Sequence, residues 1–348
     1  MNKKIIKLGN LRITKNSPAL IICEIGINHN GNLKIAKKMV DAAKKAGTLI
    51  IKHQTHIPNE EMSVESKKIK PSNSNKDIYS IIKNCSLNES DEYELMKYVE
   101  KKGLFFLSTP FSKAAVDRLV KFKVKAFKIG SGEFNNLPFI EYVASFKKPM
   151  ILSTGMNDIA QIRRTITVLK KQKANFALMH TTNLYPTPHR LVRLEAMQEI
   201  MNKFPDYFIG LSDHTTDNFS SYFAISMGAK IIEKHFTDSK KRKGPDISCS
   251  MDPKDFYEIN KAALLFNKMY KGKKIAAKEE KVTSNFAFGS VVSIKSIKEG
   301  ERLSHKNIWI KRPGTGFFKS EDFKKLLGKK AKREIKKNIQ LKKGDVID

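Results

Sequence analysis

The chain is poor in cysteine and in acidic residues, and it has no long apolar segment. Its three cysteines, Cys23, Cys85 and Cys249, are odd in number and show no C-x-x-C spacing, so we expect free thiols in a reducing compartment. No apolar run approaches the roughly 20 residues that span a bilayer. The charged N-terminus also lacks an apolar signal core. These absences predict a cytoplasmic protein that does not insert into membranes.

Acidic residues are scarce compared with basic ones. The chain has 66 Lys plus Arg against 35 Asp plus Glu, a net charge of +31. Such an excess makes nucleic-acid binding a hypothesis. The basic residues are nevertheless spread along the chain, as in Lys37-Lys38, Lys170-Lys171 and Lys336-Lys337, and no helix-turn-helix, zinc-finger or RNA-recognition signature is present. The pattern favours a solvated, lysine-rich surface that attracts anionic small molecules.

Short apolar strands alternate with amphipathic helices over most of the chain. Helices are predicted, for example, over Lys34–Ala46 and Ile159–Lys171. Eight strand–helix units in about 270 residues predict a (β/α)8 TIM barrel. A doubly wound open sheet is disfavoured because no G-x-G-x-x-G follows the first strand. The eight candidate strands end at Cys23, Lys52, Leu107, Lys128, Leu152, Met179, Leu211 and Ile232.

The composition of the chain changes near residue 270. We predict a catalytic barrel over 1–270, a linker over 271–284 and a small domain over 285–348 with short strands and turns. The polar interval Asn59–Lys76, between the second and third strands, is too long for a simple connection. We expect it to lie over the catalytic face of the barrel.

Polar side chains follow each predicted strand. In a barrel these positions converge on one face, so eight of them in succession indicate a pocket for a polar ligand. The residues are Glu24; Lys52 and Gln54; Ser108 and Thr109; Lys128 and Ser131; Ser153 and Thr154; Thr181, Asn183 and Tyr185; Asp213 and His214; Glu233 and His235.

The residue types in this pocket restrict its chemistry. Lysines, hydroxyls and amides suit phosphate and carboxylate groups, and Glu24 is the carboxylate best placed for acid–base work. His214 and His235 follow neighbouring strands and are a plausible pair of metal ligands. The residues alone predict metal-assisted chemistry on a phosphorylated or carboxylated small molecule. Lyase, aldolase-like condensation and phosphotransfer stay open; a Schiff base on Lys52 or Lys128 is disfavoured.

The pocket residues stand in longer motifs. These are Glu24-Ile25-Gly26-Ile27-Asn28-His29-Asn30-Gly31, Lys52-His53-Gln54-Thr55-His56, Ser108-Thr109-Pro110-Phe111-Ser112, Lys128-Ile129-Gly130-Ser131-Gly132-Glu133, Thr182-Asn183-Leu184-Tyr185-Pro186, Gly210-Leu211-Ser212-Asp213-His214, Glu233-Lys234-His235-Phe236 and Lys311-Arg312-Pro313-Gly314. In sequence and order they resemble the sialic acid synthase family over nearly the whole chain. The resemblance implies a barrel followed by an antifreeze-like (SAF) domain.

The resemblance also implies a reaction: a transferase that condenses phosphoenolpyruvate with N-acetylmannosamine to give N-acetylneuraminate and phosphate. It implies that His214 and His235 hold Mn²⁺, with Mg²⁺ or Co²⁺ as alternatives, and that Glu24 is the general acid/base. It further implies a homodimer in which Arg312 of the SAF domain completes the partner's site. The implied phosphoenolpyruvate ligands are Lys52, Asn73, Thr109, Lys128, Ser131, Ser153, Asn183 and Tyr185, and the implied sugar ligands are Gln54, Glu133, Asp246 and Arg312.

Two other functions compete with this interpretation. The first is synthesis of a related nonulosonic acid, legionaminic or pseudaminic acid. The segments Lys52–His56 and Glu133–Asn136 favour the N-acetylneuraminate branch. The second is a non-catalytic, basic nucleic-acid-binding protein, for which steep salt-dependent affinity without turnover would be the evidence.

Overall fold

The computed structural model describes residues 5–71 and 75–347. The chain separates into two compact units, Met1–Lys271 and Gly272–Asp348. Among the described residues, no helix is both long enough and apolar enough to cross a membrane.

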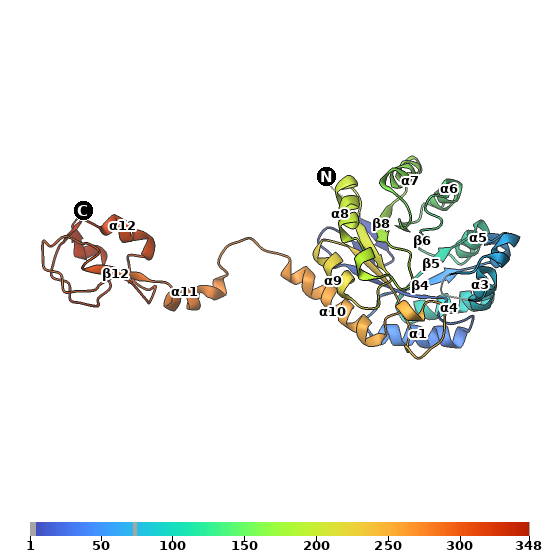
Figure 1. Cartoon of the computed structure of the whole chain (residues 1–348), viewed down its shortest axis with the longest axis horizontal. Helices are drawn as coiled ribbons and strands as arrows, with labels where there is room; N and C mark the ends of the chain where they lie inside the picture. The colour runs from blue at the N-terminus through green and yellow to red at the C-terminus, as the bar shows by residue number, and fades with distance from the viewer. Residues whose placement is uncertain (1–4, 72–74, 348) are drawn as a thin grey trace. The chain divides into compact units, whose positions relative to one another are not determined.

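The first unit is a nearly closed barrel of eight parallel strands surrounded by helices (Figure 1). The sheet order is β5-β4-β3-β10-β9-β8-β7-β6. Within the described residues β5 and β6 lie next to each other without forming a ladder. The predicted TIM barrel is therefore confirmed. Its strands are β3 (Leu20–Gly26), β4 (Ile50–Thr55), β5 (Phe105–Pro110), β6 (Phe127–Ile129), β7 (Met150–Ser153), β8 (Phe176–Thr181), β9 (Ile209–Asp213) and β10 (Ile231–His235).

The helices form where a capping side chain meets an apolar stripe. In α7, Asp158 caps the first turn in a reciprocal capping box with Gln161, and the helix buries Ile162, Ile166 and Leu169 against the barrel. The other main helices of this unit are α1 (Leu33–Lys45), α3 (Ile78–Cys85), α4 (Glu89–Lys101), α5 (Lys113–Lys121), α6 (Leu137–Ser145), α8 (Leu194–Lys203), α9 (Phe219–Ser226) and α10 (Pro253–Met269), with α7 at Ile159–Lys171.

The interior of the barrel changes from apolar to polar along the strands. A hairpin of β1 (Ile6–Leu8) and β2 (Leu11–Ile13) packs into the apolar end. Side chains two residues apart share a face of a strand, so each apolar position leads to a polar one. These pairs are Ile22 and Glu24, Ile50 and Lys52, Leu107 and Thr109, Ala126 and Lys128, Ile151 and Ser153, and Ile231 and Glu233.

The polar ends of several strands were predicted one to three residues too early. Glu24, Gln54, Asp213 and His235 belong to the ladders rather than to the loops after them. A strand that lines a polar pocket keeps its backbone pairing after its side chains become polar. The apolar run therefore ends before the strand does.

The second unit is small and built from short elements. Its antiparallel pairs join β11 (Ser290–Ser293) to β12 (Ile308–Lys311) and β13 (Lys330–Ala331) to β14 (Val346–Ile347). Two short helices, α11 (Lys281–Ala287) and α12 (Phe323–Leu326), accompany them. Its own apolar core includes Val291, Ile308 and Leu341. Helix α11 begins inside the stretch predicted as linker.

Candidate active site

Two lysines and two glutamates fill the base of the polar pocket. Lys52 Nζ lies 2.6 Å from Glu24 Oε2 and 3.2 Å from Glu233 Oε1. Lys128 Nζ lies 3.7 Å from Glu233 Oε2 and donates to Ser153 Oγ at 2.7 Å. All five side chains are buried. Buried charges persist when they are paired and hydrogen-bonded, as they are here.

Burial changes the protonation of these groups. It raises the pKa of Glu24 to about 7, although the Lys52 ammonium opposes the shift. It lowers the pKa of Lys128 to about 8, against the attraction of Glu233. For Glu233 burial is outweighed by Lys128 and Lys52, which lower its pKa. Of the two glutamates at the base, Glu24 is therefore the one able to exchange a proton near neutral pH.

Two neutral imidazoles, those of His214 and His235, lie at the same polar end of the barrel. The ring centroids of His214 and His235 are 5.3 Å apart, and Tyr185 stacks on His214 at 4.2 Å. His214 Nδ1 lies 2.9 Å from the carbonyl oxygen of Thr182, so Nδ1 carries the proton and Nε2 keeps its lone pair. Burial lowers the pKa of His214 to about 4 and, with the neighbouring His214, that of His235 well below its usual range.

This imidazole pair fits a divalent metal. Both rings are neutral, and buried His235 Nδ1 has no hydrogen-bond partner, although Asp246 Oδ2 lies 3.4 Å away. Among the described residues, no group of three or more His, Cys, Asp and Glu side chains is arranged to hold a metal. The two histidines would therefore leave most coordination positions to water and substrate.

A chain of hydrogen bonds leads from Glu24 to a second wall of the pocket. Gln54 Nε2 donates to Glu24 Oε1 at 3.0 Å, and Gln54 Oε1 lies 3.0 Å from His56 Nε2. His56 Nδ1 in turn lies 3.0 Å from the Glu61 carboxylate, and the ring stacks on Phe111. These contacts fix the orientation of the Gln54 amide toward the pocket.

Unsatisfied polar atoms mark where a ligand would bind. Thr109 Oγ1 and Asn183 Oδ1 are buried without a hydrogen-bond partner. A Cβ on Gly155 would lie 1.8 Å from Asn183 Oδ1 and 2.8 Å from Ser131 Oγ. Glycine at position 155 therefore leaves room for these two side chains in the positions they occupy.

The pocket has a volume of about 740 Å³ and two unlike walls. The polar wall contains Gln54, Tyr185, His235 and Asp246. Burial raises the pKa of Asp246 to about 6. The other wall is largely apolar. It combines Ile27, just after β3, with Pro71, Ile78, Ile81 and Ile82 from the segment before α3 and from α3 itself. Pro71 and Lys76 place part of the predicted long loop at the pocket.

The sequence matches known families along most of its length. Residues 39–274 match the NeuB family and residues 288–347 match the SAF domain. The chain belongs to the NeuB family. The family resemblance and the SAF domain predicted from the motifs are thereby confirmed.

Individual relatives of this NeuB-family chain extend the match. It is 39% identical to an uncharacterized protein of Methanocaldococcus jannaschii, over 89% of this chain and 90% of that one. It is 36% identical to N,N'-diacetyllegionaminic acid synthase of Campylobacter jejuni (92% and 97%) and 32% identical to human N-acetylneuraminate-9-phosphate synthase (90% and 88%). A crystal structure of N-acetylneuraminic acid synthetase from Leptospira borgpetersenii superposes with a TM-score of 0.74 at 28% identity, covering 81% and 95%.

The structure brings most of the predicted site residues together. Asn73 lies outside the described residues, and Arg312 belongs to the second unit, where its side chain is exposed. Thirteen residues belong to the barrel's polar end and its loops: Glu24, Lys52, Gln54, Thr109, Lys128, Ser131, Glu133, Ser153, Asn183, Tyr185, His214, His235 and Asp246.

Sequence reasoning missed several residues of this site. Ser212 Oγ donates to Glu233 Oε1 at 3.2 Å. Ser212 lies on β9, two residues before His214, so the side chains of these two residues point to the same face. This spacing could have identified Ser212 as a site residue. His56 stands two residues after Gln54 and carried the same signal. Glu61 and Ile81 reach the site through folding of the β4–α3 segment, and their sequence carries no comparable signal.

Glu133 makes stability depend on pH. Burial raises its pKa from 4.5 to about 7, and Glu133 Oε2 has no hydrogen-bond partner. A raised carboxyl pKa contributes stability that is full below the unfolded value and is lost as pH rises through the folded one. Relative to Glu133→Gln, the wild type should lose about 3 kcal/mol of unfolding free energy between pH 4.5 and 7. Urea denaturation of both proteins at several pH values measures this, and parallel curves would contradict it.

Proposed function

We propose that this protein condenses phosphoenolpyruvate with an N-acetylated sugar aldehyde, forming a sialic-type nonulosonic acid and releasing phosphate. One observation carries the proposal: a lysine- and hydroxyl-lined base and a pair of neutral, buried imidazoles share the polar end of the barrel, where Lys52 and Glu233 act electrostatically on both imidazoles. The first feature suits a small, highly charged anion, and the second suits a metal that activates a carbonyl group. The named activities of the relatives support the same reaction.

The base of the pocket would bind phosphoenolpyruvate. Lys52 and Lys128 supply charge, and Thr109 and Ser153 supply hydroxyls to the phosphate and carboxylate oxygens. An anion beside Lys128 would favour its charged form and oppose the effect of burial on its pKa. Ser131, Asn183, Tyr185 and Asn73 would complete this set by the family resemblance.

His214 and His235 would hold the divalent ion, Mn²⁺ foremost, with Mg²⁺ or Co²⁺ as alternatives. When bound, such an ion supplies Lewis acidity toward the sugar aldehyde oxygen. Tyr185 packs against His214, and Thr182 fixes the tautomer of His214. Gln54, Glu133 and Asp246 would orient the sugar so that its aldehyde carbon faces phosphoenolpyruvate.

The proposed reaction forms one C–C bond, breaks one C–O bond and uses one carboxyl group to accept a proton. C3 of phosphoenolpyruvate bonds to the aldehyde carbon, whose oxygen becomes a hydroxyl after taking a proton. Water adds at C2. The remaining hydroxyl oxygen then forms the C2 ketone as the C2–O bond to phosphate breaks, and the electron pair of that bond and the hydroxyl proton leave with phosphate. Glu24, with a pKa of about 7, would accept the proton of this water, while Lys52 stabilises the carboxylate form.

Two sugars are candidates. The sequence motifs favour N-acetylmannosamine. A diacetamido sugar is the second candidate, because the apolar wall of Ile78, Ile81 and Ile82 offers a surface for an additional acetyl methyl group. The 36% identity to a diacetyllegionaminic acid synthase favours the same choice.

Substitution of the apolar wall tests this specificity. Ile81→Asn should lower kcat/KM for a diacetamido sugar about tenfold more than for N-acetylmannosamine, because a lost methyl contact has an effect of that size. Steady-state phosphate release with each sugar measures both constants. Leu264→Asn, at an exposed position on α10, is the matched control. An unchanged ratio would exclude Ile81 from sugar selection.

The proposed enzyme would act as a homodimer in which Arg312 reaches the sugar in the partner's site. In the second unit Arg312 is exposed and starts a loop that is tied to α11, where Gly314 N donates to the Asn285 carbonyl at 2.7 Å. An exposed, anchored guanidinium is suited to a partner's polar ligand. A monomeric mass in light scattering, with full activity, would contradict this arrangement.

A further inference from the structure

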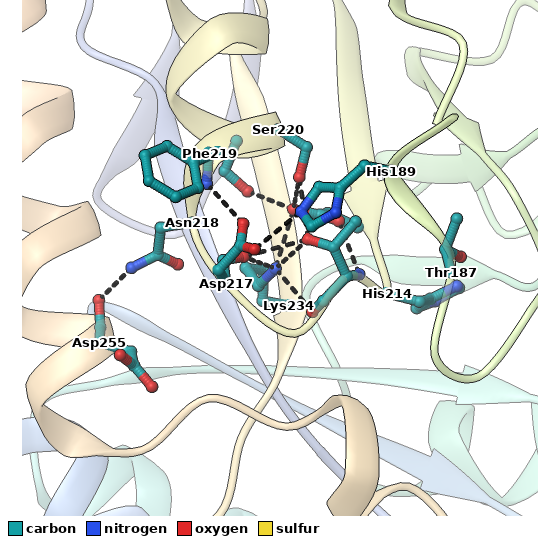
Figure 2. Close-up of polar contacts among 12 residues, drawn as sticks. Thr187, His189, His214, Asp217, Asn218, Phe219, Ser220, Lys234 and Asp255 are labelled. Carbon is teal, nitrogen blue, oxygen red and sulfur yellow. Dashed lines mark hydrogen bonds and ion pairs between the residues drawn. The ribbon is translucent and has the colours of Figure 1, made fainter. Parts of the chain in front are cut away.

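Lys234 is a completely buried cation immediately before His235. Its Nζ lies 2.8 Å from Asp213 Oδ2 and 2.6 Å from the carbonyl oxygen of Asp217. It also lies 3.2 Å from both the carbonyl oxygen and the hydroxyl of Thr215. Figure 2 shows this ammonium reaching the loop that follows His214. All of these hydrogen-bond acceptors belong to β9 or to that loop.

The position of Lys234 follows from strand alternation. Glu233 and His235 face the pocket, so Lys234 between them points to the opposite face of β10. On β9, Asp213 has the same relation to Ser212 and His214. Lys234 and Asp213 are direct partners in the parallel ladder. The ion pair therefore joins the two strands one residue before each imidazole.

Asp213 is held from several directions. Besides Lys234, its carboxylate accepts hydrogen bonds from Ser220 Oγ at 2.5 Å, Ser221 Oγ at 2.7 Å and the Thr215 backbone N–H at 2.9 Å. The two serines lie on α9, so the carboxylate connects β9, the following loop and the helix. Such a satisfied buried network has little freedom to shift.

The loop after His214 is also fixed on its outer side. His189 Nε2 lies 2.7 Å from Asp217 Oδ2, and the Thr187 N–H donates to the His214 carbonyl at 2.9 Å. Asn218 Nδ2 donates to the Asp255 carbonyl at 2.8 Å. Figure 2 shows these residues on the segments around the Lys234 ammonium. Lys234 is the cation at the centre of this arrangement.

We infer that Lys234 is a positioning residue for the two imidazoles: its ammonium ties β9, β10 and the intervening loop together and thereby fixes the separation of His214 and His235. The inference rests on the metal-binding part of the proposed function. Metal–nitrogen bonds tolerate deviations of only about 0.2 Å, so ligands on two strands require a rigid connection. An ammonium provides three donors, which here reach acceptors on β9 and on the loop after His214 from a residue of β10.

The test measures Mn²⁺ affinity rather than turnover. Free Mn²⁺ is titrated by electron paramagnetic resonance against the full chain without substrates. Lys234→Met should weaken Mn²⁺ binding by about 10- to 100-fold, the range for loss of a residue that orients metal ligands. Phosphoenolpyruvate affinity, measured by calorimetry without metal, should change less than about twofold, since Lys52 and Lys128 are untouched. Lys234→Arg should recover most of the Mn²⁺ affinity.

Further variants separate positioning from folding. Lys234→Met/Asp213→Asn removes both charges, so no unpaired charge remains buried, and it should bind Mn²⁺ as weakly as Lys234→Met. Arg118→Met is the control, because Arg118 Nη1 donates to buried Glu92 at 3.1 Å on another side of the barrel. It should bind Mn²⁺ as the wild type does. If Lys234→Met does not fold, the Mn²⁺ affinities of the double variant and of Thr215→Val test the inference instead.

The outcomes distinguish failure of the inference about Lys234 from failure of the proposed metal-binding function. Mn²⁺ affinity within twofold of wild type in the folded double variant would overturn the role of Lys234 and leave the metal site intact. Failure of the wild type to bind Mn²⁺ would overturn the metal site and the positioning role together. An equal loss of affinity in Arg118→Met would show a general effect of buried charge and would also overturn the inference.

Discussion

Replacing His235 with alanine is expected to lower sugar-dependent phosphate release from phosphoenolpyruvate by about 1,000-fold. The substitution removes one of the two imidazoles proposed to hold the metal, and Lewis-acid activation of a carbonyl contributes several kcal/mol to the barrier. Phosphoenolpyruvate binding should be nearly unchanged, since Lys52 and Lys128 reach the pocket from β4 and β6. Stopped assays with Mn²⁺, and calorimetry with phosphoenolpyruvate alone, measure the two effects.

A second buried histidine provides the control. His180 lies on β8, and its Nε2 is 2.7 Å from the Val192 carbonyl oxygen. His180→Gln should therefore leave sugar-dependent turnover within a few-fold of wild type in a protein of similar stability. Turnover in His235→Ala comparable to that of His180→Gln would contradict the assignment of His235 to the reaction.

Replacing Lys52 with methionine is expected to affect both stability and binding. Its ammonium lies between Glu24 and Glu233, so the variant leaves carboxylates buried without their cation. Removing one partner of a buried pair costs about 3–5 kcal/mol of unfolding free energy. Phosphoenolpyruvate affinity should also fall by about 100-fold, because a charge-assisted contact in a buried site is lost. Urea denaturation and calorimetry measure these quantities.

The double variant Lys52→Met/Glu233→Gln separates the two effects. Neutralising Glu233 removes an unpaired charge, so much of the lost stability should return. Phosphoenolpyruvate binding should remain weak, because the ammonium is still absent. Recovery of both stability and binding in the double variant would show that Lys52 has only a structural role.

The barrel could be predicted because its signals are local. Each apolar run marked a strand, and α7 has the bounds that its apolar period indicated. The ends of the strands could not be located in this way, since Glu24 and His235 continue the ladder as polar residues. The β1–β2 hairpin was not predicted either. Its six residues are recognisable as a plug only when the barrel interior against which they pack is known.

The strand-end residues of the candidate site could be predicted from the sequence, whereas the residues of its apolar wall could not. Strand-end positions such as Lys52 and Lys128 follow from the barrel's geometry alone. Ile81 was not predictable as a pocket residue, because its place depends on how α3 packs against the segments that hold Ile27 and Met62. The sequence also gave no sign that Lys234 bonds to Asp217 rather than to solvent. That contact depends on the register between β9 and β10.

The most direct test of the account follows the fate of phosphoenolpyruvate. The wild-type protein is incubated with Mn²⁺, phosphoenolpyruvate labelled with ¹⁸O at the C2–O bridge, and either N-acetylmannosamine or a diacetamido sugar. The proposed condensation predicts that phosphate is released only when one of the sugars is present, that the phosphate carries the label, and that the product has the mass of the sugar plus pyruvate. Absence of phosphate release with both sugars, or phosphate that lacks the label, would contradict it.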